Sequence, residues 1–132
     1  RDLGRELGCG AHISALRRVV SGATSLADCV ELALFEERGG TLWNECCLDP
    51  ARALELPIRQ VSSQELTDVL VGRHIAAGEV EETGKGTSRR MPLQQEKVAI
   101  VHDRRLFGVW YCHGSELICK ANFPQGISGV IA

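Results

Sequence analysis

The first part of the chain combines apolar residues at helical spacing with a stretch in which apolar and polar residues alternate. Leu3 and Leu7 lie four residues apart among charged residues, and Gly8 follows, which predicts the last turns of a helix that ends at a glycine. Small and polar residues then alternate with apolar ones, and this pattern predicts a strand over residues 9–20.

A second helix is predicted after Ser25. Ser25 has the side chain of an N-cap, Asp28 follows three residues later, and apolar residues recur at helical spacing until Gly39-Gly40. Residues 42–47 have no decisive pattern. The first part of the chain is therefore predicted to be helix–strand–helix.

The middle of the chain carries two signals for the start of a helix. Asp49 followed by Pro50 predicts a helix of one or two turns with the aspartate at its N-cap. Ser62 and Glu65 have the spacing of a capping box, which predicts a helix that continues through Val71 and is closed by a glycine.

The last part of the chain predicts β-structure. Residues 57–61 are extended, and apolar runs over 98–101, 106–112 and 116–123 are joined by links of hairpin length. Residues 79–97 are polar, contain glycines and include few apolar positions, so we expect a long mobile loop there.

Composition places the chain among globular proteins. Of its 132 residues, 44% are hydrophobic and 24% are charged, and no apolar run is long enough for a transmembrane helix. The formal net charge of −2 excludes binding to nucleic acid through net charge alone. Residues 1–49 contain five basic and eight acidic residues, whereas residues 50–132 contain ten and nine, so the second part is the less acidic one.

The six cysteines are predicted to be free thiols. No C-x-x-C motif occurs, and Cys46-Cys47 are adjacent, which is an awkward geometry for a disulfide. No signal peptide is visible at the start of the sequence. We therefore expect a reducing compartment, the cytoplasm.

Few residues suggest catalysis or metal binding. Asp49 lies in Leu-Asp-Pro, but no base or second carboxylate stands at a useful spacing, so the N-cap interpretation is favoured. Residues 84–88 resemble a phosphate-binding loop in composition but lack its spacing, which favours a flexible loop. Cys112, His113 and Cys119 match no common zinc spacing.

Pairs of adjacent arginines are candidates for contact with RNA. On a strand, one of Arg17 and Arg18 can reach a phosphate while the other pairs with a carboxylate, and a structural ion pair is the alternative. Arg104 and Arg105 lie in a predicted hairpin turn and are candidates too. The alternative interpretation of Arg104 and Arg105, and also of Arg89-Arg90, is that they are solvated surface charges.

The start of the sequence resembles a known family. Residues 2–18 read DLGRELGCGAH, then Ile-Ser-Ala, then Leu-Arg-Arg. They resemble the bacterial tRNA pseudouridine synthase B family, which carries D-L-G-x-x-L-G-x-G-(A/G)-H-(L/V)-x-x-L-R-R near the end of its catalytic domain. The glycines, the histidine and Leu-Arg-Arg all keep their spacing. The later helices and the closing strands are similar to that family's PUA-like RNA-binding domain by pattern rather than by motif.

This resemblance implies an α+β fold in two parts. Residues 1–47 would be the C-terminal edge, helix–strand–helix, of a pseudouridine synthase catalytic domain. Residues 48–132 would be a small β-rich PUA-like RNA-binding domain. The chain begins at Arg1 without an initiator methionine, which favours a C-terminal fragment of a longer protein.

The resemblance also implies a reaction and the residues that serve it. The parent enzyme would be an isomerase that flips the T-loop uridine out of tRNA and converts it to pseudouridine, without cofactor or metal. The family's catalytic aspartate lies in an upstream G-A-L-D-P-x-A-T-G motif, so we expect no catalytic residue here and no activity from this chain alone. In that family the leucine of Leu-Arg-Arg lines the uridine pocket, and the corresponding residue here is Leu16. The alternative is that Leu16 is an ordinary core residue. After Leu-Arg-Arg the family has T-R-x-G-x-F, whereas residues 19–24 of this chain read Val-Val-Ser-Gly-Ala-Thr.

The expected partner is tRNA, contacted at its T-loop and stem and at its acceptor end. Arg17, Arg18, Arg104 and Arg105 are the expected contacts, and neither a membrane nor a metal is expected. The truncated edge of the catalytic sheet is a candidate surface for dimerisation. Two alternatives are a freestanding RNA-binding module without catalysis and a structural domain that binds no RNA.

Overall fold

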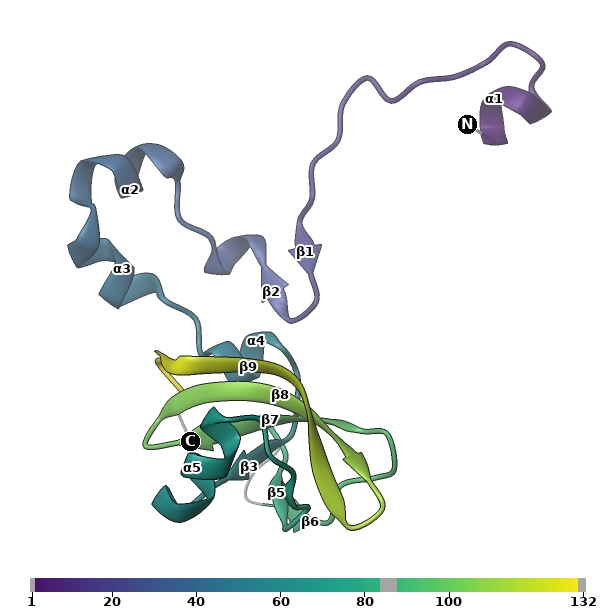
Figure 1. Cartoon of the computed structure of the whole chain (residues 1–132). Helices are drawn as coiled ribbons and strands as arrows, with labels where there is room; N and C mark the ends of the chain where they lie inside the picture. The colour runs from purple at the N-terminus through teal and green to yellow at the C-terminus, as the bar shows by residue number, and fades with distance from the viewer. Residues whose placement is uncertain (1, 84–87, 131–132) are drawn as a thin grey trace.

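The computed structural model describes residues 2–83 and 88–130. Figure 1 shows a curled β-sheet built from the second part of the chain, with short helices and an extended segment from the first part leading into it. The fold is mixed α and β, as predicted.

Short helices dominate the first part of the chain, and the strands dominate the second. The helices are α1 (Asp2–Glu6), α2 (Leu32–Arg38), α3 (Gly40–Cys46), α4 (Pro50–Ala53) and α5 (Ser63–Leu70), with a 3-10 turn at Leu26–Asp28. The strands are β1 (Val20–Ser21), β2 (Thr24–Ser25), β3 (Ile58–Gln60), β4 (Ile75–Ala76), β5 (Val80–Glu81), β6 (Arg89–Arg90), β7 (Lys97–His102), β8 (Arg105–His113) and β9 (Glu116–Ser128).

The two helix-start signals in the middle of the chain are confirmed. Asp49 Oδ1 accepts hydrogen bonds from the backbone N–H groups of Ala51 (2.8 Å) and Arg52 (3.1 Å) at the start of α4. Ser62 Oγ accepts from the Glu65 N–H (3.2 Å), and Glu65 Oε2 accepts from the Ser62 N–H (2.8 Å), which completes a capping box for α5. These contacts form because the first N–H groups of a helix have no partner within it.

The strand predicted over residues 9–20 is wrong. Only Val20 of that stretch is in a strand, and it pairs with Ser25 in the two-residue ladder of β1 and β2. Residues 9–19 are exposed and extended, and no strand in the described part of the chain pairs with them. Alternating residues favour a strand, but the strand forms only where a neighbour satisfies its backbone groups.

The single helix predicted after Ser25 is also wrong in its extent. Asp28 Oδ2 accepts hydrogen bonds from the Ser25 N–H (2.8 Å) and hydroxyl (2.9 Å), but only a 3-10 turn follows. The α-helix begins at Leu32 and is folded back by Gly39, so that the rings of Phe35 and Trp43 meet edge to face with centroids 6.2 Å apart.

The polar stretch over residues 79–97 is not a mobile loop throughout. It contains β5 and β6, which pair with each other, and β5 also pairs with β3. Arg90 makes ion pairs with Glu82 (2.9 Å) and Glu96 (2.6 Å), and Arg89 makes a further one with Glu81. Ion pairs together with the burial of a single apolar residue, Val80, hold these short strands, which is why a composition poor in apolar residues did not reveal them. Residues 84–87, most of the stretch with the composition of a phosphate loop, lie outside the described residues.

The main sheet has the strand order β4-β9-β8-β7-β3-β5-β6. The pairing of β3 with β7 is parallel, and the other pairings are antiparallel. Register shifts between β7 and β8 and between β8 and β9 add curvature. At one shift, Gly108 brings the backbone so close to β9 that a Cβ would lie 2.6 Å from the Ala121 carbonyl oxygen.

Apolar clusters cover both faces of the sheet. The cluster under α5 contains Val61, Val69, Ile75, Ala77, Val80, Val98, Ile100, Phe107, Trp110, Cys112 and Leu117. The cluster under α4 contains Ala51, Ile58, Ala99, Val101, Leu106 and Val130. Strand β7 therefore contributes alternate residues to both. None of the helices in residues 2–83 and 88–130 has the length and apolar character required to span a bilayer.

The ion pair between Arg90 and Glu96 predicts a pH-dependent contribution to stability. Two hydrogen bonds from the Arg90 guanidinium (2.6 and 2.8 Å) hold the pKa of Glu96 below its usual range. We expect Glu96→Gln to lower the free energy of unfolding at neutral pH by about 1 kcal/mol. The loss arises because the variant gives up the ionised partner of Arg90.

Urea denaturation at several pH values measures this contribution. Since the folded-state pKa is depressed, the stabilisation is complete above the unfolded pKa of about 4.3 and disappears as the pH falls through the folded value. The difference between wild type and Glu96→Gln is therefore expected to shrink in acid. Glu79→Gln is the control, because Glu79 has no ion pair among the described residues. A difference that stays constant from neutral pH to pH about 3 contradicts the assignment.

Candidate nucleic-acid interface

A basic and aromatic surface lies on the exposed part of the sheet face opposite α5. The strand register places Lys97 of β7 directly beside Tyr111 of β8, and Tyr111 beside Ile118 of β9. His113 and Lys120 lie two residues further along their strands, on the same face.

The alternation of side chains along β8 and β9 explains why these residues face outward. Trp110 and Cys112 are buried under α5, so Tyr111 between them projects to the other side of the sheet. Leu117 is buried in the same way, which turns Ile118 outward. The core on one face thus determines which residues form the surface on the other.

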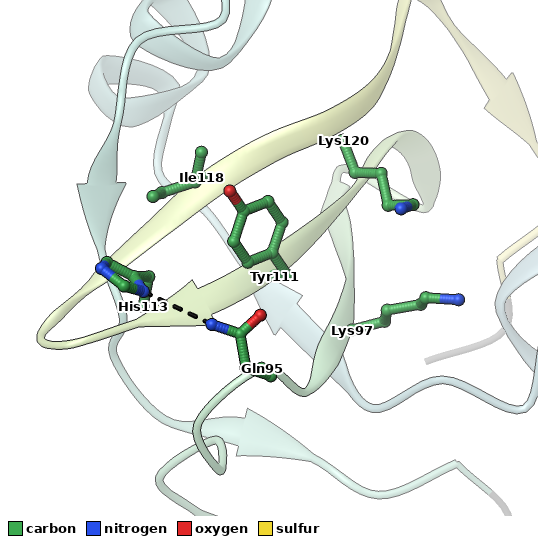
Figure 2. A pocket seen from close by; sticks show the side chains of 6 residues that line it. All are labelled: Gln95, Lys97, Tyr111, His113, Ile118 and Lys120. Atoms are coloured by element: carbon green, nitrogen blue, oxygen red, sulfur yellow. Dashed lines mark hydrogen bonds between the residues drawn. The ribbon is translucent and has the colours of Figure 1, made fainter.

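These side chains line a cavity of about 480 Å³. Its lining residues are Gln95, Lys97, Tyr111, His113, Ile118 and Lys120, and none of them is acidic. In Figure 2 the tyrosine ring lies in the middle of the group, with both lysines on one side of it and His113 on the other. We refer to this cavity and its lining as the sheet-face pocket.

One wall of the sheet-face pocket is held by an unusual backbone conformation. Gln95 has a φ of 63°, in the left-handed region, and its N–H donates to the Cys112 carbonyl (2.8 Å). The Gln94 amide exchanges two hydrogen bonds with the backbone of Gly114 (2.9 and 3.0 Å). The Gln95 side-chain nitrogen then lies 3.4 Å from His113 Nδ1. These contacts tie the segment before β7 to the β8–β9 turn.

The arrangement is suited to binding rather than to catalysis. A half-buried aromatic ring on a sheet face can stack on a base, and lysines can contact phosphates. No group of three or more possible metal ligands occurs in the described part of the chain. Cys112 and His113 are adjacent on a strand and point to opposite faces, so they cannot share one zinc ion.

The structure places Leu16, Arg17 and Arg18 in the exposed segment between α1 and β1. Leu16 is 82% exposed in the described chain, and its two interpretations, pocket wall and ordinary core, stay predictions. Arg17 and Arg18 are exposed, and neither forms an ion pair within residues 2–83 and 88–130.

Arg104 and Arg105 lie at the β7–β8 turn and hold the end of the chain through backbone carbonyls. Arg104 Nε donates to the Val130 carbonyl (3.3 Å), and Arg105 Nη2 donates to the carbonyls of Gln125 (2.7 Å) and Gly126 (2.9 Å). Carbonyl acceptors leave the positive charges in place, and both arginines remain exposed.

Lys97, Tyr111 and Lys120 were not predicted as site residues from the sequence. A signal was present for Tyr111 and Lys120, which lie in predicted strands, whereas Lys97 fell at the end of the loop predicted over residues 79–97. What could not be seen was the pairing that brings three strands into one row, because register depends on contacts distant in sequence.

Comparisons with known proteins find relatives of one kind. Residues 1–61 match the family model described as the tRNA pseudouridylate synthase B C-terminal domain. The tRNA pseudouridine synthase B of Corynebacterium diphtheriae is 40% identical over 73 residues, which are 55% of this chain and 23% of that protein.

Two further relatives have the same printed name. The tRNA pseudouridine synthase B of Paenarthrobacter aurescens is 45% identical over 78 residues (59% of this chain, 24% of the relative). That of an Arthrobacter species is 36% identical over 106 residues (80% of this chain, 32% of the relative), so the similarity extends beyond residue 61 into the sheet. The matched region is thus 23–32% of the length of these curated relatives. On this evidence the chain is similar to the C-terminal part of tRNA pseudouridine synthase B proteins.

Proposed function

We propose that this chain is the C-terminal, RNA-binding part of a tRNA pseudouridine synthase that isomerises the T-loop uridine of tRNA. The observation that carries the proposal is the family match over residues 1–61, continued by the relatives into a sheet whose exposed face is basic, aromatic and free of acidic lining residues. In the parent enzyme the T-loop uridine is flipped out of the loop so that its glycosidic bond becomes accessible.

The catalytic aspartate of the parent enzyme belongs to a segment other than this chain. Asp49 is the residue of this sequence in a Leu-Asp-Pro context, and its carboxylate accepts two backbone hydrogen bonds at the start of α4. That capping role supports a structural function for Asp49. The chain by itself is therefore proposed to bind tRNA without converting it.

Residues 1–47 are proposed to complete a catalytic domain, and residues 48–132 to form a PUA-like RNA-binding domain. Support comes from the unequal burial of apolar side chains, since Leu42 is the one buried hydrophobic residue before residue 51 in the described chain. Six large apolar side chains in the first part are 61–82% exposed, namely Leu3, Leu7, Ile13, Leu16, Leu32 and Trp43. Exposed apolar surface on this scale indicates a protein partner, here the remainder of the synthase.

Leu16 would form one wall of the uridine pocket in that assembly. Its side chain is exposed in the described chain and thus available to pack on a flipped base and exclude water from it. Arg17 and Arg18 follow directly and carry charges that no carboxylate of the described residues neutralises. We propose that they contact phosphates, as do Arg104 and Arg105 at the β7–β8 turn.

The salt dependence of tRNA binding tests the proposed phosphate contacts of the sheet face. Each phosphate contact to duplex nucleic acid contributes about 0.9 to the slope of log K against log salt concentration, and about 0.7 to single strands. We expect the double variant Lys97→Gln/Lys120→Gln to reduce that slope by between about 1 and 2. Fluorescence anisotropy with labelled tRNA at several salt concentrations measures it.

The matched control is Arg38→Gln/Arg89→Gln, which removes the same formal charge. Both arginines already pair with carboxylates, Arg38 with Glu45 (2.8 Å) and Arg89 with Glu81 (2.7 Å). The control is expected to leave the slope nearly unchanged. Equal slopes for wild type and the lysine variant would contradict a phosphate-binding role for the sheet face.

A test of catalysis asks whether this chain alone forms pseudouridine. Incubation of this chain with unmodified tRNA is expected to yield bound tRNA but no pseudouridine, measured by mass spectrometry of the digested RNA after chemical labelling. Pseudouridine formed at a rate proportional to the concentration of the chain would refute the proposal that its catalytic aspartate lies elsewhere. A G-x-L-D-P-x-A-T-G motif encoded upstream in the source gene supports the parent enzyme, and its absence favours a freestanding RNA-binding module.

A further inference from the structure

We infer that the sheet-face pocket binds one unpaired nucleotide, with its base stacked on Tyr111 and its phosphates held by Lys97 and Lys120. This inference rests on the proposed RNA-binding function and assigns a site and a ligand class to it. It concerns the face formed by β7, β8 and β9, away from the segment that contains Leu16.

The charge of the lining separates this pocket from other cavities of the molecule. A second cavity is lined by Arg59 and Arg89 together with Glu79 and Glu81. A third combines two arginines with Glu55, Glu82 and Glu96. Carboxylates in a cavity repel the phosphates of a nucleic acid, whereas the lining of the sheet-face pocket carries two lysines and no acid.

The shape and position of the aromatic ring favour an unpaired base. Tyr111 is half-buried at the centre of the group, as Figure 2 shows, with its strand neighbours Lys97 and Ile118 on either side in the sheet register. A base inside a duplex is stacked on its neighbours and offers no free face, so the ring can stack only on a base that is unpaired or at a strand end. The volume of about 480 Å³ lies within the range of about 300–1,000 Å³ that small-ligand sites occupy.

The polar wall supplies groups for the edge of the base. Gln95 and His113 meet at 3.4 Å beside Tyr111, and together they offer hydrogen-bond donors and acceptors to a ligand in the pocket. Gln95 is held in its left-handed conformation by the hydrogen bond to Cys112, and its neighbour Gln94 is fastened to Gly114. The wall is therefore ordered before a ligand arrives, which lowers the entropic cost of binding.

A single-stranded pentaribonucleotide and a duplex of the same sequence test the inference on the full chain. Tyr111 is the one tyrosine in the sequence, so its ring protons are identified without ambiguity in an NMR spectrum. Stacking of a base is expected to move these signals upfield on addition of the single strand, and the duplex is expected to leave them in place.

Two substitutions give an independent readout by fluorescence anisotropy. Tyr111→Leu is expected to weaken binding of the single strand by about tenfold or more, because a stacked base is lost. Tyr111→Phe keeps the ring and is expected to remain within about threefold of wild type. Thermal unfolding of each variant checks the fold, and the NMR signals of wild type keep the test valid if Tyr111→Leu does not fold.

The outcomes separate this inference from the proposed function. If tRNA binds but the Tyr111 signals do not move and the duplex binds as well as the single strand, the nucleotide pocket is refuted and RNA binding stands. Loss of affinity in Tyr111→Phe equal to that in Tyr111→Leu also refutes stacking. If neither tRNA nor the single strand binds at low salt, both proposals fail, and a protein partner for this face takes their place.

Discussion

The burial of β7 on both faces is the constraint on which the rest of this structure depends. Val98 and Ile100 pack under α5, while Ala99 and Val101 pack under α4, so a single strand belongs to two apolar clusters. A strand of this kind cannot slip by one residue, because a slip would exchange the two sets of side chains. The register of β7 with β8 then carries over to β9 and places every outward-facing residue of the sheet.

The candidate interface is a consequence of that register. Where the α4 cluster ends, the same face of the sheet continues to Lys97, which is exposed, and to Tyr111 and Ile118, which are half-buried. The ring and the lysines lie together because the opposite face is closed by the core under α5. The candidate interface and the core thus use alternate residues of the same strands, which allows the outward-facing set to change without loss of the core.

The first part of the chain follows a different principle. It has capping and turn signals that act locally, as at Ser25 and Asp28, but it buries little of its apolar surface. The relatives that the chain matches are longer proteins, and the exposed leucines of this part are consistent with packing against a segment of such a protein. Helices as short as these gain most of their stability from tertiary packing rather than from intrinsic propensity.

The sequence by itself determined the features that depend on near neighbours: the caps at Asp49 and Ser62, the closing strands and the motif that carries the family resemblance. Each of these is set by residues a few positions apart. Only the tertiary structure decided that residues 9–19 lack a strand partner among the described residues, that the polar stretch around Arg90 forms strands through ion pairs and the burial of Val80, and that Lys97, Tyr111 and Lys120 share one pocket. These outcomes depend on contacts between distant segments, whose energies no local pattern contains.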